Sequence, residues 1–595
     1  MRVSDYIMNR LQEAGIDHVF LVTGRGALFL TDALAKHPLL EPVCVHHEQS
    51  AAYAAVAYAQ QRGTIGACLV STGCAATNAM TGVLSAWQDG IPCIFISGQN
   101  ILKETSRYTG IPIRTYGQQE ADIISLVEPI TKYAKMITSP NQIIEAMDNA
   151  LMLANSGRKG PVWLDIPLDL QSALVEPDKI DPSSITKPAL PIASDEVMAS
   201  VADALSKAER PAILIGHGVR SACAEKALRL FIEKSQIPVT YTASAPDTYG
   251  SAQFPMSIGS VGSMGCSRAG SFTVQNADLL LVLGSRLTSL TTGPDFCKFA
   301  RGGKIILVDI DEIEHSKESI QIDSLILSDL NYFLDKLNQL KVKPAEASWA
   351  QKCQHWKSHF GRVEDIFKST DQVDLYELAD KLSDTLPSEV NIVTDSGLVE
   401  VILPTNIRFS EGMRCIHPAS QGAMGYALPA AIGAYYSNLK PTVAIIGDGS
   451  IMMNLQELET IRYHQLPIKI LVINNNAYSI IRRRQRDLFR KRIIGTDPDN
   501  GVSCPEFSKV ATCFDMDYMR IENLAQLTMG LEKTFSTSRP TLCEIMGRPD
   551  QGYIEISQVR SEIDRRLVRR PLEDQAPFLS RNDFIAEMII DPIDQ

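Results

Sequence analysis

The sequence lacks the features that would assign it to several common classes of protein. No apolar run approaches the roughly 20 residues that a membrane-spanning helix requires. The first residues, MRVSDYIMNRLQEAG, place Asp5 where a signal peptide would have an unbroken apolar core. The 12 cysteines include no CxxC pair, so neither a zinc site nor a disulfide framework is indicated. We therefore expect a cytoplasmic protein with no membrane partner, because unpaired cysteines suit a reducing compartment.

An excess of positive charge is also missing. The chain has 57 Lys and Arg against 69 Asp and Glu, a formal net charge of -12. Because such a surface repels the phosphate backbone, we expect no nucleic-acid partner. What is present is a composition of 45% hydrophobic and 21% charged residues, which excludes disorder, collagen-like repeats and coiled coil. With 595 residues, and about 150 residues in a typical domain, two to four domains are expected.

The pattern of short apolar runs predicts the fold. These runs end in Gly, Asp, Asn or Ser and alternate with longer amphipathic stretches, which is typical of βαβ units with parallel strands. We predict an α/β fold of three Rossmann-like, doubly wound parallel-sheet domains, over residues 1–175, 190–342 and 370–550. The expected strands are HVFLV, GACLV, PCIFIS and VWLDI, then PAILIG, ADLLLVLG and KIILVDID, then NIVTD, TVAIIGDGS, IKILVINNN and TLCEI.

Two segments fall outside these three blocks. The prolines and polar residues of VEPDKIDPSSITKPALP, which follows the first block, favour an extended surface linker. Residues 551–595 are charged and interrupted by proline, which suggests a tail lying over the domains. A poorly ordered terminus is the alternative for this last segment.

The most informative stretch joins two of the expected strands in the third block. One strand runs into Gly447-Asp448-Gly449-Ser450, and the next ends in Asn474-Asn475-Asn476. Consecutive parallel strands of a right-handed βαβ unit end at the same edge of the sheet, so Asp448 and Asn475 should be neighbours. Carboxylate and amide oxygens suit Mg²⁺, while Gly449 and Ser450 suit a nearby phosphate. The tetrad alone is weak evidence, because most such sequences are turns.

This pair of motifs resembles the signature of the thiamine-diphosphate-dependent enzymes, GDG followed by NN. The resemblance is closest to the acetolactate synthase branch and covers nearly all of the chain. It implies that Asp448, Asn475 and the carbonyl of Ala477 bind the Mg²⁺ that anchors the cofactor diphosphate. It also implies that the Gly422 carbonyl accepts from the 4'-amino group and that Met424 props the cofactor into its bent shape; a core gap-filler is the alternative for Met424.

The second motif that carries the resemblance is His47-Glu48-Gln49, before an alanine-rich helix. A carboxylate here is usually only a helix cap, but the matching family Glu donates a hydrogen bond to the pyrimidine ring. Such a Glu48 must be protonated near neutral pH, which requires an apolar, desolvated site. In the family this Glu and the metal motif come from different subunits. The resemblance therefore implies pyrimidine-binding and diphosphate-binding domains at the two ends of the chain, and a homodimer or homotetramer.

The central block resembles the flavin-binding domain of the same branch. The similarity rests on Gly216, Gly218, Arg286 and Asp309, where glycines after strands permit close approach to phosphates and a strand-end Asp can bond ribose. Several branches of the family bind ADP or nothing here. We expect FAD in a structural role, with an empty Rossmann-like domain as the alternative.

Three positions depart from the acetolactate synthase pattern. Leu290 stands where the family has an Arg that contacts the carboxylate of the second 2-keto acid, Arg484 replaces a pocket-lining Trp, and Gln118 replaces a Phe. A Leu cannot pair with a carboxylate. Together these changes indicate a bulkier, more polar, phosphate-bearing acceptor, such as a nucleotide-activated keto-sugar. A solvated surface face is the alternative for the arginine cluster around Arg484.

We therefore predict a carboligase that decarboxylates pyruvate and transfers the two-carbon unit to a carbonyl acceptor, with Gln119 as a polar group near the reacting centre. One alternative is an acetolactate synthase that condenses two pyruvates. A second is a 2-keto acid decarboxylase that releases free aldehyde. The third is a non-catalytic, cofactor-binding regulatory protein.

Overall fold

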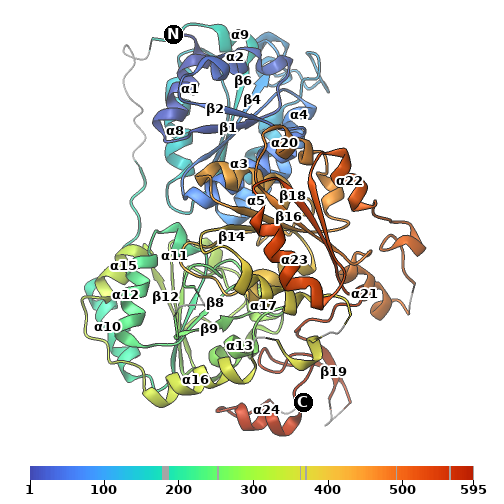
Figure 1. Cartoon of the computed structure of the whole chain (residues 1–595). Coiled ribbons are helices and arrows are strands. Elements are labelled where there is room, and N and C mark those ends of the chain that lie inside the picture. The colour runs from blue at the N-terminus through green and yellow to red at the C-terminus, as the bar shows by residue number, and fades with distance from the viewer. Residues whose placement is uncertain are drawn as a thin grey trace.

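The computed structural model describes residues 1–176, 187–250, 254–361, 363–368, 371–490, 492–561 and 565–593. Most of the linker expected after the first block lies outside these residues. The described chain contains three six-stranded sheets with flanking helices, and one two-stranded sheet near its end (Figure 1). All strand pairs within the three sheets are parallel, which confirms the predicted α/β class.

The N-terminal sheet contains the four strands expected in the first block. Its strands, in spatial order, are β2 (Glu41–Cys44), β1 (His18–Leu21), β3 (Gly66–Val70), β4 (Cys93–Gln99), β6 (Pro161–Pro167) and β5 (Tyr133–Met136). The main helices around it are α1 (Val3–Glu13), α2 (Leu28–Lys36), α3 (Glu48–Arg62), α4 (Cys74–Asn78), α5 (Met80–Asp89) and α8 (Gln142–Ala154).

The central sheet is covered by helices on both faces. Its strands, in spatial order, are β12 (Ser324–Leu327), β11 (Lys304–Asp309), β10 (Leu279–Leu283), β7 (Pro211–Ile215), β8 (Val239–Tyr241) and β9 (Ser257–Ser260). One face packs on α10 (Asp195–Lys207), α12 (Glu225–Ser235) and α15 (Leu330–Leu337), and the other on α13 (Arg268–Asn276) and α16 (Ala347–His359). Alternate strand residues serve the two faces: Ile213 packs in one core and Leu214 in the other.

The C-terminal sheet has the same kind of double cover. Its strands, in spatial order, are β14 (Arg414–Ile416), β13 (Asn391–Thr394), β15 (Thr442–Gly447), β16 (Lys469–Asn474), β18 (Thr541–Met546) and β17 (Asp517–Ile521). One face packs on α19 (Ala427–Asn438), α20 (Glu457–Tyr463) and α22 (Phe507–Cys513), and the other on α17 (Leu375–Thr385), α18 (Leu398–Asn406) and α23 (Leu524–Ser536).

Helices α3 and α19 join the two end domains. All residues of α3 from Ser50 to Ala59 are buried, and most of them are alanine. These small side chains let α19 approach closely, since a Cβ at Gly433 would lie 1.9 Å from the Ala54 carbonyl oxygen. A single hydrophobic core therefore runs through the N-terminal and C-terminal domains.

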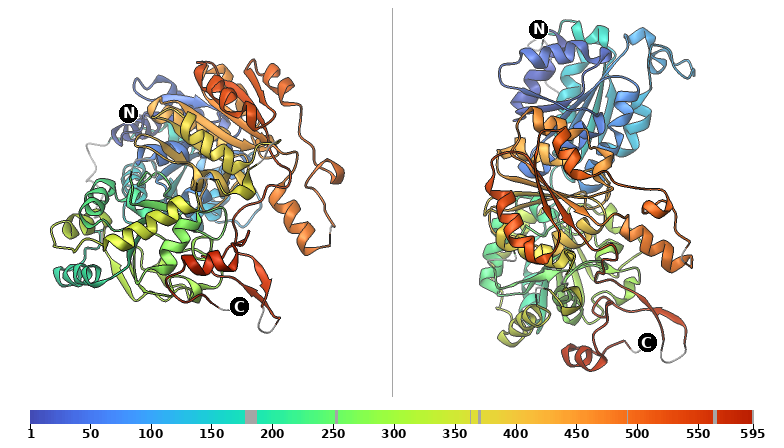
Figure 2. Two further views of the ribbon diagram at one scale, coloured as in Figure 1. Left: turned by 60° about the horizontal axis from the view of Figure 1, so that its bottom comes forward. Right: turned by 45° about the vertical axis from the view of Figure 1, so that its right-hand side comes forward.

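The segment after residue 551 first packs in the C-terminal core, through Tyr553 and Ile554, and then lies against the central domain (Figure 2). They form β19 (Gln558–Arg560), β20 (Leu567–Arg569) and α24 (Arg581–Glu587). Leu572 and Phe584 enter the core beside α13, and Glu573 pairs with Arg301 at 2.6 Å. No helix among the described residues has the length and apolar character to cross a bilayer.

Candidate functional site

A cavity of about 430 Å³ opens at the carboxyl ends of the C-terminal strands. Strands β15 and β16 are neighbours, with Gly447 opposite Ile473, so the residues that follow them lie at one edge of the sheet. Seven residues singled out from the sequence line this cavity: Met424, Gly447, Asp448, Gly449, Ser450, Asn475 and Ala477. The geometric expectation for the two motifs therefore holds in this structure.

The Asp448 side chain is 3% exposed and is held by backbone amides. Gly449 N donates to one of its carboxylate oxygens at 2.7 Å, and Asn476 N donates to the other at 2.5 Å. Burial raises the pKa of Asp448 to about 6. A divalent cation beside this carboxylate would favour its charged form.

Asn475 completes a set of oxygen donors at the same edge. Its Oδ1 accepts from Ala477 N at 3.1 Å, and its Nδ2 donates to Ser479 Oγ at 2.7 Å, which fixes the amide. Asp448, Asn475 and the Ala477 carbonyl thus offer the hard oxygen ligands that Mg²⁺ takes. The donor set fits the predicted ion.

Asp395 was not found in the sequence analysis, yet it ties the cavity walls together. It follows β13, and its Oδ1 accepts from Ser450 Oγ at 2.7 Å and from Gly425 N at 3.1 Å. Burial raises its pKa to about 6. The signal that could have revealed it is the same as for Asp448, an acidic residue directly after a buried strand.

Glu400 is a second residue that the sequence did not reveal. It lines the cavity from α18, and its Oε2 lies 3.2 Å from where a Cβ at Gly422 would stand. Gly422 has a φ of +58, so the predicted turn requires glycine here. Burial, with Asp395 and Asp89 nearby, raises the pKa of Glu400 well above its usual range. A protonated Glu400 can donate a hydrogen bond at the cavity wall.

Glu48 and Gln119 each lie beside α4 on the N-terminal domain. Glu48 begins α3 and accepts from Asn78 Nδ2 at 3.0 Å. A Cβ at Gly73, just before α4, would lie 1.8 Å from the Gln119 carbonyl oxygen, so this glycine lets the Gln119 segment dock beside α4. Glu48 is partly exposed and Gln119 is exposed. The apolar surroundings expected for Glu48 are therefore not formed by one chain.

The three predicted acceptor residues lie on three different parts of the chain. Leu290 lies in α14 (Ser289–Thr292) and lines a small cavity beside Arg286. Arg484 lies on α21 (Ser479–Leu488) and pairs with Glu555 at 3.4 Å. Gln118 is on the N-terminal domain, where Arg25 donates to its side chain. Their treatment as one acceptor site therefore stays a prediction.

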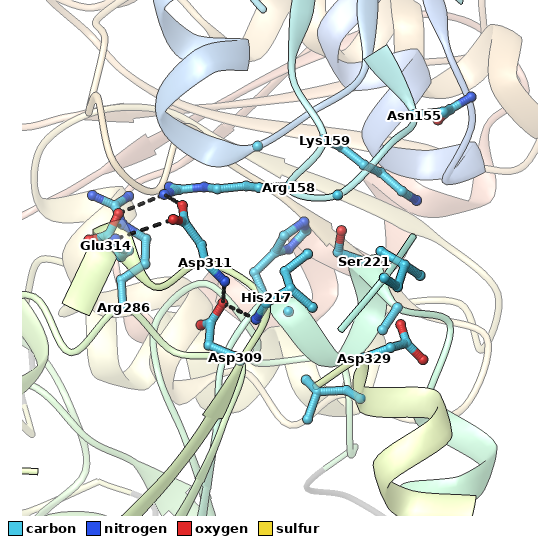
Figure 3. A pocket seen from close by; sticks show the side chains of 18 of the residues that line it. Asn155, Arg158, Lys159, His217, Ser221, Arg286, Asp309, Asp311, Glu314 and Asp329 are labelled. Atoms are coloured by element: carbon cyan, nitrogen blue, oxygen red, sulfur yellow. Dashed lines mark hydrogen bonds and ion pairs between the residues drawn. The ribbon is translucent and has the colours of Figure 1, made fainter. Parts of the chain in front are cut away.

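A separate pocket of about 170 Å³ lies at the carboxyl ends of the central strands (Figure 3). Gly218, Arg286 and Asp309 line it, as expected from the sequence. The Asp309 Oδ1 accepts from Ile310 N at 2.7 Å and from Asp311 N at 3.1 Å. This carboxylate therefore already organises its own loop.

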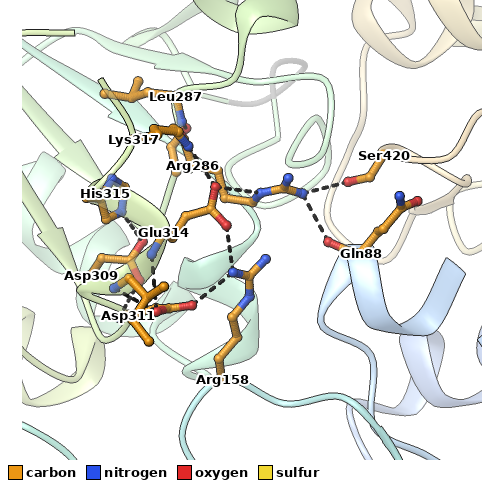
Figure 4. A network of polar contacts seen from close by, with 12 residues as sticks. Gln88, Arg158, Arg286, Leu287, Asp309, Asp311, Glu314, His315, Lys317 and Ser420 are labelled. Atoms are coloured by element: carbon orange, nitrogen blue, oxygen red, sulfur yellow. Dashed lines mark hydrogen bonds and ion pairs between the residues drawn. The ribbon is translucent and has the colours of Figure 1, made fainter. Parts of the chain in front are cut away.

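The arginines of the central pocket have carboxylate partners inside it (Figure 4). Arg158 pairs with Asp311 at 2.9 Å and with Glu314 at 2.7 Å. Arg286 approaches Glu314 at 3.3 Å and donates to the Gln88 carbonyl at 3.0 Å and to Ser420 Oγ at 2.8 Å, thereby linking all three domains.

The predicted glycines of the central pocket also serve its own packing. A Cβ at Gly216 would lie 2.4 Å from the Gly284 carbonyl oxygen, and one at Gly218 would lie 2.6 Å from Gly284 Cα. The close approach that these glycines permit is thus between two loops. Asp309, at the end of its strand, suits a ribose hydroxyl. Gly216 and Gly218 do not by themselves support a site for the diphosphate of FAD, because each lies against the Gly284 loop.

Known protein families match this chain in three parts. The matching descriptions are "Thiamine pyrophosphate enzyme, N-terminal TPP binding domain" over residues 1–126, the central domain of the same enzymes over 198–337, and their "C-terminal TPP binding domain" over 395–545. The cavity with Asp448 and Asn475 lies within the third match.

Three similar proteins span nearly the whole chain. The acetolactate synthase large subunit of Parasynechococcus marenigrum is 30% identical, over 91% of this chain and 86% of that protein. The acetolactate synthase isozyme 2 large subunit of Escherichia coli is 31% identical, over 92% of this chain and 95% of that protein. The acetolactate synthase large subunit of Corynebacterium glutamicum is 31% identical, over 96% of this chain and 91% of that protein. The chain therefore belongs to the thiamine-diphosphate-dependent enzymes, in their acetolactate synthase-like, carbon–carbon bond-forming branch.

Proposed function

We propose that this chain decarboxylates pyruvate and joins the remaining two-carbon unit to a carbonyl acceptor other than a second pyruvate. Pyruvate loses CO₂, one carbon–carbon bond forms to the acceptor carbonyl carbon, and the acceptor oxygen gains a proton. The observation that carries the proposal is that the buried Asp448 and the partly buried Asn475 line one cavity together with Glu400. Thiamine diphosphate supplies the electron sink for decarboxylation when it is bound.

The residues of the C-terminal cavity would orient the cofactor. Asp448, Asn475 and the Ala477 carbonyl would hold Mg²⁺, while Gly449 and Ser450 would lie against the diphosphate. The Gly422 carbonyl and the Met424 side chain would face the aminopyrimidine, as the sequence predicts. The network around Asp395 keeps this turn and Ser450 in a fixed relation, which preorganises the cavity.

Glu48 would act on the pyrimidine ring from the other subunit of a homodimer, or of a homodimer within a homotetramer. Two observations support this arrangement: the cavity is lined by C-terminal residues, and Glu48 remains partly exposed in one chain. A partner surface would supply the apolar, desolvated surroundings that the predicted role of Glu48 requires. Gln119, on the same edge, would then face the reacting centre.

The acceptor separates this proposal from its nearest alternative. Leu290 carries no charge for a second keto acid, which favours another acceptor, for example a nucleotide-activated keto-sugar. The names of the similar proteins favour two pyruvates and an acetolactate product. The two functions differ in one measurable respect, the need for an added acceptor.

Mass spectrometry of the products tests the proposal directly. Protein loaded with thiamine diphosphate and Mg²⁺ is given pyruvate alone, and then pyruvate with panels of aldehydes, ketones and nucleotide keto-sugars. We expect a two-carbon adduct only when an acceptor is added. Acetolactate from pyruvate alone would establish the alternative, free acetaldehyde would indicate a decarboxylase, and no CO₂ release from any 2-keto acid would leave only a cofactor-binding protein.

The flavin prediction is tested independently of activity. We propose FAD in the central pocket on the strength of Asp309 at the end of β11 and the resemblance of its loops. A yellow purified protein with flavin absorbance would support this assignment. If denaturation released ADP in a stoichiometric amount, or released no nucleotide at all, the assignment of FAD would be contradicted.

A further inference from the structure

A second cavity of about 410 Å³ adjoins the cofactor cavity and is rich in arginine. The two cavities share Ser479, the first residue of α21. Arg482, Arg483 and Arg486 line the second cavity from this helix, and Arg548 lines it from the segment after β18. We refer to this space as the arginine cavity.

The acidic partners of three of these arginines lie behind them. Arg482 pairs with Asp497 at 3.2 Å, Arg548 pairs with Asp374 at 3.1 Å, and Arg483 pairs with Glu555. The side chains of these three acids are only 10%, 0% and 8% exposed, and none of the three lines the cavity. These acids therefore hold the guanidinium groups in place from the protein side.

The acids that do line the arginine cavity lie on its exposed rim. The Asp487 side chain is 53% exposed and lies 3.8 Å from Arg483, and that of Asp550 is 75% exposed and lies 3.9 Å from Arg548, so water screens both of these long pairs. Arg486 pairs with the neighbouring Asp487 at 3.2 Å. The wall of the cavity thus carries four positive charges against two screened negative ones.

The C-terminal tail takes part in this arrangement. Glu555 N donates to the Ala576 carbonyl at 2.9 Å, and Ala576 N donates back at 2.8 Å. This pairing fixes the Glu555 that holds Arg483, while Ala576 itself lines the cavity. The tail segment around Ala576 is therefore part of the site.

We propose that the arginine cavity binds a phosphate or diphosphate group on the carbonyl acceptor. Planar guanidinium groups donate paired hydrogen bonds to phosphate oxygens, and their fixed orientation lowers the entropy lost on binding. This inference rests on the proposed function, because it places the charged end of the acceptor beside the cofactor cavity.

The geometry of α21 sets the length of such an acceptor. At a rise of about 1.5 Å per residue, Arg486 lies roughly 10 Å along the helix from Ser479. A three-carbon keto acid cannot span this distance. A sugar phosphate or a sugar linked to a nucleoside diphosphate can, and both present the same phosphate oxygens.

Calorimetry on the loaded enzyme tests the proposal. Protein saturated with thiamine diphosphate and Mg²⁺, whose diphosphate site is already filled, is titrated with ribose 5-phosphate and with UDP-glucose. We expect at least one of them to bind, about tenfold more weakly to Arg486→Gln and about a hundredfold more weakly to Arg482→Gln/Arg486→Gln. Tighter binding of ribose 5-phosphate would identify a phosphate monoester site, and tighter binding of UDP-glucose a diphosphate site.

Matched variants separate this outcome from a general loss of structure or charge. Arg486→Lys keeps the charge but loses the paired donors, so its affinity should fall between wild type and Arg486→Gln. Arg539→Gln removes an exposed arginine elsewhere in the same domain and should bind like wild type. Circular dichroism and the unfolding midpoint check that each variant is folded.

The proposed function has its own readout, CO₂ release from pyruvate in the absence of any phosphorylated compound. If CO₂ is released but neither compound binds at millimolar concentration, the arginine-cavity proposal is overturned while the proposed function stands. Binding that is equal in wild type and the double variant would overturn it as well. If a compound binds as expected but no CO₂ is released, the cavity binds phosphate and the proposed function fails.

Discussion

The central and C-terminal domains have the same six-stranded parallel architecture but use the ends of their strands differently. In the central pocket, Asp311 and Glu314 stand inside the pocket and pair with its arginines. At the C-terminal edge, Asp448 faces the cofactor cavity. Three poorly exposed acids lie behind the guanidiniums of the arginine cavity, and the two acids that line this cavity lie on its exposed rim. The placement of carboxylates relative to the cavity, more than the number of charges, decides what each site can bind.

The largest expected effect comes from a change in the N-terminal domain. This domain should contribute to the rate of decarboxylation but not to the affinity for thiamine diphosphate. Glu48→Gln should lower the rate of pyruvate decarboxylation by about 10²–10⁴-fold, because a general acid–base contact to the cofactor is lost. The affinity for thiamine diphosphate should remain within about threefold of wild type, since the C-terminal cavity is intact. Glu41→Gln, at an exposed position of the same domain, is the control.

A mixing experiment sharpens the same prediction. Glu48→Gln and Asp448→Ala should each be nearly inactive in isolation, but a mixed dimer would contain one site with neither change. Dissociated and reassociated at equal amounts, the two variants should recover about a quarter of wild-type activity if the site is shared across a twofold interface. No recovery, in mixtures shown to contain the mixed dimer, would place Glu48 and Asp448 in the same subunit's site.

A fall in pH below 6 should weaken the binding of Mg²⁺ and the cofactor in the C-terminal cavity, whereas the ion pairs of the central pocket should persist at this pH. Because burial raises the pKa of Asp448 to about 6, Mg²⁺ must displace a proton below this pH. The apparent dissociation constant of the Mg²⁺–cofactor complex should increase about tenfold for each pH unit below 6, and remain level between pH 7 and 8. Fluorescence titration at fixed ionic strength measures this; a constant affinity down to pH 5 would refute the role of Asp448.

Removal of a carboxylate from the central pocket should lower the stability of the folded protein. Although burial alone would raise the pKa of Glu314, hydrogen bonds from Lys317 and Arg158 lower it to about 2. Glu314→Gln should therefore lower the free energy of unfolding by about 1–2 kcal/mol at pH 7. This figure allows for the screening of the ion pairs by water, because the partners of Glu314 are partly exposed. The difference should shrink as the pH falls from about 4.5 toward 2, and denaturant unfolding of both proteins would reveal it. An unchanged midpoint at pH 7 would show that these pairs contribute nothing.

The sequence predicted the parts of the molecule that follow from local pattern. The strands were visible as apolar runs, and the meeting of Asp448 and Asn475 followed from the fixed handedness of βαβ units. Asp395 was passed over because the single acid that ends NIVTD has no second motif beside it, although its position after β13 is equivalent to that of Asp448 after β15.

Other features depend on contacts that one sequence does not display. The surroundings of Glu48 require another subunit, so its environment could not be derived from its neighbours in the chain. Resemblance singled out Arg484, but the phase of α21 turns Arg482, Arg483 and Arg486 into the arginine cavity instead. The carboxylates that hold these arginines come from positions far along the chain, such as Asp374 and Glu555.

Calorimetric titration of thiamine diphosphate with and without Mg²⁺ tests the central claim most directly, using wild type, Asp448→Ala and Asp309→Ala. Both variants remove an aspartate at the end of a parallel strand, one in each domain. We expect Mg²⁺-dependent binding to wild type, a loss of at least about a hundredfold in Asp448→Ala, and near-wild-type binding to Asp309→Ala. Equal binding to wild type and Asp448→Ala, or binding that is indifferent to Mg²⁺, would contradict the account.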